Sequence, residues 1–208
     1  MAVGIVSKVR NFACLLSGHG VELGRQAWDR EYQQGQWQYL HGLDQRPRYS
    51  VIVGYLLYFK PGAAVLDVGC GEGILQRMLA PVGYRRYVGI DFSGPAIQTA
   101  RSGAEPRSTF HECDAATWQP TELFDAIIFN EALYYFRDPT DMLHRYEKAL
   151  KADGIFVVSM YWRAGNTGRI WSKIDRHYPC LHQTKLTCGP AQTWVIKVLT
   201  RRGARVEG

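Results

Sequence analysis

The fold of this chain is decided by one short stretch, residues 65–73, which reads Val-Leu-Asp-Val-Gly-Cys-Gly-Glu-Gly. Its first four residues continue an apolar run that begins at Ala64, which is typical of a buried strand. Three glycines then alternate with other residues, and an apolar segment from about Ile74 to Leu79 follows as a predicted helix. A strand, a glycine turn and a helix in this order predict a ligand site, because glycine lets a ligand approach the backbone closely.

The residues of the turn separate two classes of ligand. Dinucleotide-binding turns read G-x-G-x-x-G and direct backbone N–H groups and a helix dipole at a pyrophosphate. Here Gly69, Gly71 and Gly73 follow the pattern G-x-G-x-G, and Asp67 stands on the strand before them. A carboxylate at that place repels a phosphate and attracts an ammonium group. We therefore expect a ligand with a cationic group; the alternative is a structural turn without a ligand.

On both sides of this turn, apolar runs alternate with helical segments. Strands are predicted at residues 64–68, 87–90, 109–112, 124–129 and 155–160, and helices at residues 1–18, 49–59, 74–79, 95–101 and from 138 onward. Ser93 and Asp138 suit the N-caps of the last two helices, and Gly154 is interpreted as the signal that ends the last one. Continuous apolar strands between helices predict a doubly wound parallel sheet that is covered on both faces.

The C-terminal part follows another pattern. Residues 183–187 and 193–199 predict two strands joined by a turn at Gly189-Pro190, with no room for a helix between them. The expected fold is therefore α/β, with a mostly parallel seven-stranded sheet and an antiparallel C-terminal hairpin. We expect a single domain over 1–208, with N-terminal cap helices in 1–60, a ligand-binding core in 61–160 and a final segment with the hairpin in 161–208.

Composition sets broader limits. The 208 residues carry a formal charge of +6, but the basic residues are scattered, so nucleic acid is not an expected partner. Five cysteines, an odd number without a C-x-x-C pair, favour a reducing cytoplasm over a disulfide framework, and no metal-ligand spacing stands out. Residues 2–16 are apolar but include Lys8 and Arg10, so we expect no signal peptide, and no uncharged stretch could span a bilayer.

Two further acidic residues end predicted strands. Asp91 could accept hydrogen bonds from both hydroxyls of a ribose, and Phe92 beside it could cover an adenine face. Asp91 fits NAD equally well, and a helix-capping role is its structural alternative. Asp114 follows the third strand, with Ala115 next to it, and could instead be a solvated loop residue.

With these residues in place, Asp67-x-Gly69-x-Gly71-x-Gly73 resembles the first motif of class I S-adenosylmethionine-dependent methyltransferases. In that family the glycines let the methionine part of the cofactor lie close to the backbone, here around Cys70, and the acidic residue helps to hold its amino group. Asp114 resembles the family's aspartate that accepts a bond from the adenine amino group. The resemblance, which covers roughly residues 28–200, implies S-adenosylmethionine as cofactor.

The end of the fourth strand is where the family's active site opens. Asn130 and Glu131 stand there, and the sequence is not Asn-Pro-Pro-Tyr, the pattern of enzymes that methylate exocyclic amines of bases or glutamine amides. The stretch Glu-x-Leu-Tyr-Tyr from Glu131 is similar to the small-molecule branch that includes the nodulation N-methyltransferases. Residues 28–40 are similar to the N-terminal cap of that branch and make Tyr32 a candidate on the cofactor side; a surface helix packed by its aromatic residues is the alternative.

The resemblance implies methyl transfer to an oxygen or nitrogen of a small molecule, by a monomer or homodimer, with 161–208 on the acceptor side. An oxygen acceptor needs a base, for which Glu131, His111 and His144 are the candidates. The alternative for Glu131 is a carboxylate that positions a ligand or caps a helix, and a structural role suits His111 within a strand. His144 is expected to be exposed, and a last group could line the acceptor pocket: Tyr134, Tyr135, Tyr161, Trp162, His177 and His182. A protein or RNA methyltransferase, a non-catalytic cofactor-binding domain and an NAD-dependent enzyme are the alternatives.

Overall fold

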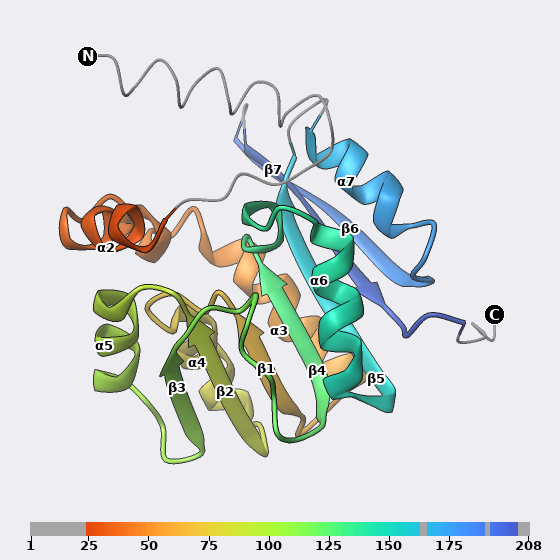
Figure 1. The fold of residues 1–208 in the computed structure, drawn as a ribbon, viewed down its shortest axis with the longest axis horizontal. Helices are drawn as coiled ribbons and strands as arrows, with labels where there is room; N and C mark the ends of the chain where they lie inside the picture. Colours follow the sequence, from red (N-terminus) through yellow and green to blue (C-terminus); the bar gives the residue numbers. More distant parts are fainter. Residues whose placement is uncertain (1–23, 163–165, 190–191, 204–208) are drawn as a thin grey trace.

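A seven-stranded sheet forms the centre of the protein, and its strands follow the order β3-β2-β1-β4-β5-β7-β6 (Figure 1). The computed structural model describes residues 24–162, 166–189 and 192–203. The strands are β1 (Ala64–Val68), β2 (Arg86–Asp91), β3 (Ser108–Glu112), β4 (Phe124–Asn130), β5 (Leu150–Tyr161), β6 (Cys180–Cys188) and β7 (Gln192–Leu199). The pairings among β1 to β5 are parallel, whereas β7 runs antiparallel to both β5 and β6. The predicted fold class, including the antiparallel hairpin, is confirmed.

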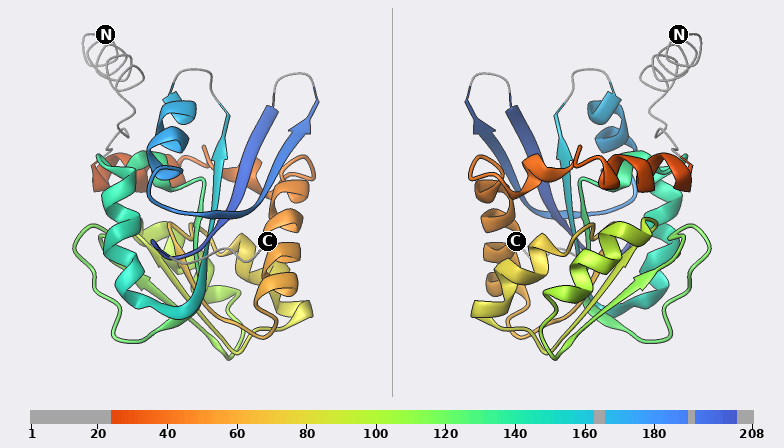
Figure 2. Two further views of the ribbon diagram at one scale, coloured as in Figure 1. Left: turned by 90° about the vertical axis from the view of Figure 1, so that its right-hand side faces the viewer. Right: turned by 90° about the vertical axis from the view of Figure 1, so that its left-hand side faces the viewer.

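Helices cover both faces of this sheet (Figure 2). The α-helices are α2 (Arg25–Gln33), α3 (Arg46–Phe59), α4 (Ile74–Leu79), α5 (Gly94–Ser102), α6 (Pro139–Tyr146) and α7 (Asn166–Ile174). Side chains of α3, α4 and α5 form one apolar layer with the sheet, and those of α6 and α7 form the other. The strands carry apolar residues on both faces, so their runs are continuous rather than alternating.

Two predicted N-caps are confirmed, and one predicted helix end is wrong. The Ser93 side chain accepts a bond from an N–H of α5, and Asp138 accepts two from the first turn of α6. Gly154 does not end a helix: α6 ends at Tyr146, and a 3-10 turn leads directly into β5. Gly154 lies in a bulge of β5, where a Cβ atom would come within 2.7 Å of the Leu150 side chain. The glycine is therefore explained by close packing inside a strand.

Helix α7 was not predicted, although Ile170, Trp171 and Ile174 form a buried stripe at helical spacing on it. The helix predicted within residues 1–18 lies outside the described residues.

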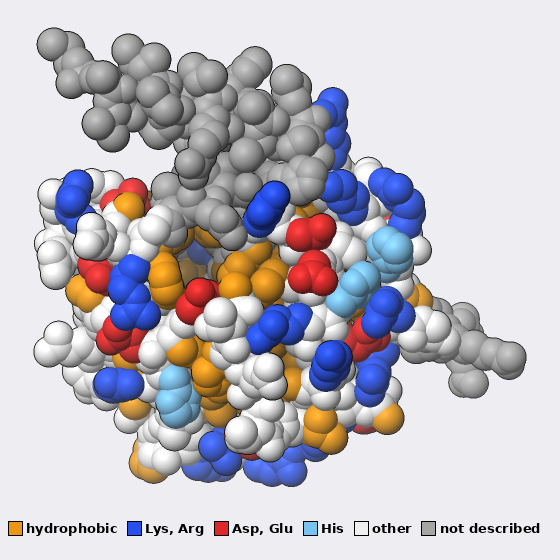
Figure 3. All heavy atoms as spheres, in the orientation of Figure 1, with side chains coloured by type: hydrophobic (Ala, Val, Ile, Leu, Met, Phe, Trp, Pro, Cys, Tyr) orange, Lys and Arg blue, Asp and Glu red, His pale blue; other side chains and the backbone are white. Residues whose placement is uncertain are grey.

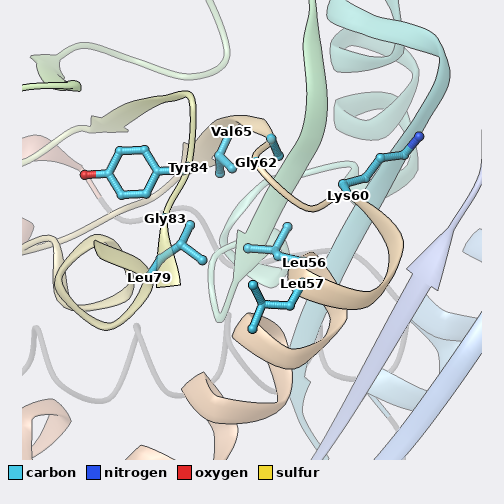
Figure 4. Close-up of a pocket in the computed structure, with 9 residues that line it drawn as sticks. Leu56, Leu57, Lys60, Gly62, Val65, Leu79, Gly83 and Tyr84 are labelled. Atoms are coloured by element: carbon cyan, nitrogen blue, oxygen red, sulfur yellow. The ribbon is translucent and has the colours of Figure 1, made fainter. Parts of the chain in front are cut away.

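The topology brings the predicted ligand residues to one edge. The carboxyl ends of β1, β2 and β4 meet there, and α2 with the 3-10 turn η1 (Gln38–His41) lies at the same end (Figure 1). At the opposite end, a small hollow lies between α3 and α4 beside Val65 and Tyr84, and the Lys60 side chain points away from its leucines (Figure 4). It has no space for a water molecule, so it is a packing gap and not a site. No described helix is long and apolar enough to cross a membrane.

Candidate active site

A cavity of about 930 Å³ opens at the carboxyl edge of the sheet. In the space-filling view, hydrophobic side chains gather around a hollow near the centre of this face, with acidic groups beside it (Figure 3). The structure brings eleven of the twelve predicted site residues to its lining: Tyr32, Asp67, Gly69, Cys70, Gly71, Asp91, Phe92, Asp114, Ala115, Asn130 and Glu131. The volume suits a small-molecule site.

The glycine turn lines the cavity, and its positions are glycine because side chains would not fit there. Gly69 has φ +77°, and a Cβ atom at this position would lie 2.6 Å from the Cβ of Ala132. A Cβ atom at Gly71 would lie 2.8 Å from the hydroxyl of Tyr32, which reaches over from α2. The turn is held to β2 by the Gly71 N–H, which donates to Asp91 Oδ2 over 2.8 Å. The left-handed backbone and these close approaches both require glycine.

Asp67, at the end of β1, carries an open hydrogen-bonding position. Its side chain is buried, with 2% exposure, and Oδ2 accepts a bond from the hydroxyl of Tyr87. Oδ1 has no hydrogen-bond partner in the described part of the chain. Burial raises the pKa of Asp67 from 3.8 to about 7, with the Tyr87 bond acting in the opposite direction. A buried carboxylate with an unused oxygen fits an ammonium group of a ligand.

Arg48 on α3 carries the complementary open position. It is 1% exposed, and its guanidinium donates to Asn130 Oδ1 and, over 3.4 Å, to Gln45 Oε1. Its Nε–H has no partner among the described residues. A buried guanidinium with an unused N–H fits a carboxylate. Arg48 and Asp67 therefore match the two charges of an amino acid head group.

Arg48 is not among the site residues predicted from the sequence, although the sequence carries a signal for it. Arg48 falls on the same helical stripe as Ile52 and Leu56, both of which are buried. A positive charge on an apolar stripe indicates either a buried ion pair or a ligand contact.

Two further acidic residues line the cavity: Asp91, the last residue of β2, and Asp114, which follows β3 by two residues. Asp91 accepts backbone bonds from Gly71 and from Ser93, the latter over 2.9 Å, so part of its capacity holds the turn itself. Asp114 likewise accepts from the N–H of Ala116 over 2.8 Å. Each carboxylate offers about four lone-pair positions, so both keep acceptor capacity for a ligand.

Glu131 lies at the other end of the cavity in a left-handed conformation, with φ 58°, which is uncommon for a residue other than glycine. Its Oε1 accepts from the Ser159 hydroxyl over 2.9 Å, and its Oε2 accepts from Tyr134 over 2.9 Å and from the N–H of Tyr161 over 3.0 Å. Burial raises its pKa, and the positive charge of Arg48 opposes that rise. Three of about four lone-pair positions are therefore engaged within the protein.

His111 is the predicted site residue that the structure does not place in the cavity. It is exposed on the edge strand β3 and stacks on Trp118 at 6.3 Å. The structure therefore does not bring His111 to the cavity with the other predicted site residues, and this position gives no support to a catalytic role.

Among the residues expected to line the acceptor pocket, Tyr134, Tyr135 and Tyr161 do so, but Trp162, His177 and His182 do not. His182 instead bonds the hydroxyl of Tyr55 over 3.0 Å. His144 is half-buried against His177 and Tyr178 rather than exposed.

The comparison with known families agrees with this geometry. The family described as "Methyltransferase domain" matches residues 31–187. The chain belongs to this family. Its members use S-adenosylmethionine, so the resemblance seen in the glycine motif is confirmed.

Curated relatives of this methyltransferase match it over part of their length. It is 36% identical over 101 residues to the ribosomal protein L11 methyltransferase of Aquifex aeolicus, which is 48% of this chain and 41% of that protein. It is 38% identical over 82 residues to Nodulation protein S of Bradyrhizobium diazoefficiens, a match that covers 38% of this chain and 39% of that protein. It is 32% identical over 127 residues to trans-aconitate 2-methyltransferase of Escherichia coli O1:K1, a match that covers 59% of this chain and 48% of that protein. The chain thus spans less than half the length of each.

A solved structure supports the fold. The N-methyltransferase NodS from Bradyrhizobium japonicum WM9, in complex with S-adenosyl-L-homocysteine, superimposes with a TM-score of 0.67. The match covers 81% of this chain and 92% of that one at 22% identity.

Proposed function

We propose that this methyltransferase transfers a methyl group from S-adenosylmethionine to an oxygen or nitrogen of a small-molecule acceptor. The observation that carries the proposal is the pair of unused buried groups beside the glycine turn, Asp67 Oδ1 and Arg48 Nε. The methionine part of the cofactor has an ammonium and a carboxylate that match these two groups. Asp91 would then accept from the ribose hydroxyls, and Asp114, with Phe92 beside it, would hold the adenine end.

Methyl transfer of this kind is an in-line displacement at carbon. When bound, S-adenosylmethionine supplies an activated methyl group, and the protein aligns the acceptor and excludes water. The aromatic cap residues Trp28, Tyr32 and Trp37 line the cavity on the side of α2 and η1, and they would provide that exclusion. An oxygen acceptor must also lose a proton, and Glu131 would be the base through its remaining lone pair.

The printed names of the relatives point to different acceptors, a ribosomal protein in one case and trans-aconitate in another, so none is carried over. A small acceptor is favoured over RNA because, among the described residues that line the cavity, only Arg48 is basic. On the face shown in Figure 3, Lys and Arg are spread out rather than gathered around the hollow. We further propose that the chain acts as a single domain.

The test uses S-adenosylmethionine labelled in the methyl group, incubated with the full chain and a cell extract that is divided into small molecules, protein and RNA. We expect label in the small-molecule fraction with the native chain and little label with Asp91→Ala. Label found chiefly in protein or RNA would favour the alternative acceptor classes. Absence of label from every fraction, despite cofactor binding, would favour a non-catalytic domain.

A further inference from the structure

The acceptor end of the cavity selects a chemical class of substrate. Resting on the function proposed above, we propose that the acceptor is an uncharged, weakly basic nitrogen compound, an aromatic or heteroaromatic amine, with an N–H group that donates to Asn166. Carboxylate acceptors are excluded by the same cavity. Three independent features carry this inference: the charge of the lining, an unused amide oxygen and a set of aromatic rings.

Carboxyl groups outnumber basic groups in the lining of the cavity. Its described residues include five carboxyl groups and one basic group, the guanidinium of Arg48; the carboxyl groups belong to Asp67, Glu72, Asp91, Asp114 and Glu131. Bound S-adenosylmethionine adds one net positive charge, because its carboxylate offsets one of its two cationic centres. An anionic acceptor would then enter a cavity with a surplus of negative charge and lose its hydration shell, which costs binding free energy.

Asn166, the first residue of α7, supplies an unused acceptor. It is 7% exposed and lines the cavity, and its Oδ1 atom has no hydrogen-bond partner in the described ranges of the chain. A buried amide oxygen is costly when unpaired. It fits a neutral N–H or O–H donor and repels a carboxylate.

Two groups of aromatic side chains line the cavity. Trp28 stacks on Trp37 at 5.3 Å and meets Tyr135 edge-on at 4.8 Å. Tyr161, at the end of β5, meets Trp194 of β7 at 5.8 Å. A lining rich in rings favours a planar acceptor, because flat surfaces stack with little loss of conformational freedom.

The hydrogen bonds of Glu131 also favour a nitrogen acceptor. Its carboxylate accepts bonds from Ser159, Tyr134 and Tyr161, which leaves little capacity for it to act as a base. A weakly basic amine arrives neutral and needs no base. Its nitrogen lone pair forms the N–CH₃ bond as the S–CH₃ bond breaks, and that electron pair goes to sulfur to give S-adenosylhomocysteine. The positive charge moves from sulfur to nitrogen within the negative cavity, and the product then releases its N–H proton to water. Carboxylates and ring faces stabilise this charge throughout.

The test uses three probes that share one ring system: 6-aminoquinoline, 6-hydroxyquinoline and quinoline-6-carboxylate. Each is titrated calorimetrically into the full chain saturated with S-adenosylhomocysteine, and each is incubated with S-adenosylmethionine while methylated product is measured by mass spectrometry. The variants are Asn166→Leu and, as a matched control, Gln98→Leu, which removes an exposed amide on α5.

We expect the amine to bind at least about tenfold more tightly than the carboxylate and to be the methylated probe. Asn166→Leu should weaken amine binding by roughly three- to tenfold, the value of one hydrogen bond, without changing the affinity for S-adenosylhomocysteine; Gln98→Leu should change neither. Equal or tighter carboxylate binding, methylation of the phenol alone, or no probe binding would overturn this inference while leaving the cofactor assignment intact. Failure of S-adenosylhomocysteine itself to bind would overturn the proposed function and this inference with it.

Discussion

At the scale of single residues, the site depends on Asp67 and Arg48, two buried charged groups that each keep one hydrogen-bonding position unused. Burying a charge without a full set of partners costs free energy, so these two groups lower the stability of the ligand-free protein. In Asp67 this cost is visible as a pKa raised to about 7. A cationic ligand group would recover it, so cofactor binding and the stability of the ligand-free protein are coupled through this residue.

The coupling predicts the behaviour of Asp67→Asn. The folded pKa lies above the unfolded value of 3.8, so the native protein loses stability as pH rises from 3.8 to about 7 and stays at the lower level above it. Between pH 5 and pH 8 this loss is about 2–3 kcal/mol. We expect Asn to remove this pH dependence and to raise the free energy of unfolding at pH 8, while S-adenosylhomocysteine binding is lost.

Urea denaturation of the ligand-free protein at both pH values measures the effect. Asp125→Asn is the control, and it should lower rather than raise the free energy of unfolding. Ion pairs with Lys151 and Arg85 lower the pKa of Asp125, so its charge stabilises the native protein above that pKa. A difference in stability between the native protein and Asp67→Asn that is the same at pH 5 and pH 8 would contradict the assignment of the raised pKa to Asp67.

The sequence predicts those site residues that belong to a local motif, and it misses those that depend on tertiary contacts. Asp67, Asp91 and the glycines stand at strand ends that periodicity locates. Arg48 reaches the site from α3, the helix that comes before β1 and therefore lies outside the glycine motif. His111 lies outside the cavity, because chain position alone does not tell which side of an edge strand faces the cavity.

At the scale of elements, the glycine turn joins β1 to the turn after β4, through the close approach of Gly69 to Ala132. The elements near this turn were predictable because their apolar runs are long and bounded by glycine or by capping residues. Helix α7 is hard to predict because it is short, Gly168 lies within it, and its apolar stripe consists of only Ile170, Trp171 and Ile174. The end of α6 was placed too late because Gly154 serves strand packing instead.

The turn gives a prediction with a matched control. Gly69→Ala and Gly62→Ala both force alanine into a left-handed backbone, at φ +77° and +67°, but only the first meets a neighbour, since nothing lies within 4 Å of a Cβ atom at Gly62. The strained backbone should cost each variant about 1–2 kcal/mol of stability, and Gly69→Ala should lose more because its Cβ atom meets Ala132. Gly69→Ala alone should also weaken S-adenosylhomocysteine binding, measured by calorimetry, because Ala132 must move. Equal affinities in the two variants would show that the approach of β1 to β4 does not shape the site.

At the scale of the whole molecule, the order β3-β2-β1-β4-β5-β7-β6 brings residues from distant parts of the chain to one edge. The alternation of strands and helices predicted this arrangement. Most of the acidic groups of the cavity were predictable, because Asp67, Asp91, Asp114 and Glu131 stand at or just after strand ends, but its size was not, because it depends on how the cap residues and α7 pack over the sheet. These acidic groups give the molecule a site of opposite sign to its overall charge of +6.

The central claim is that S-adenosylmethionine occupies this cavity with its ribose on Asp91. Calorimetric titration of S-adenosylhomocysteine into the native chain and into Asp91→Ala, with NAD as the competing ligand, tests it most directly. We expect one site in the native chain, an affinity that is roughly 10- to 100-fold lower in Asp91→Ala through loss of bonds to a charged acceptor, and no NAD binding at matched concentration. Unchanged affinity in a folded Asp91→Ala variant, or NAD bound as tightly as S-adenosylhomocysteine, would contradict the account.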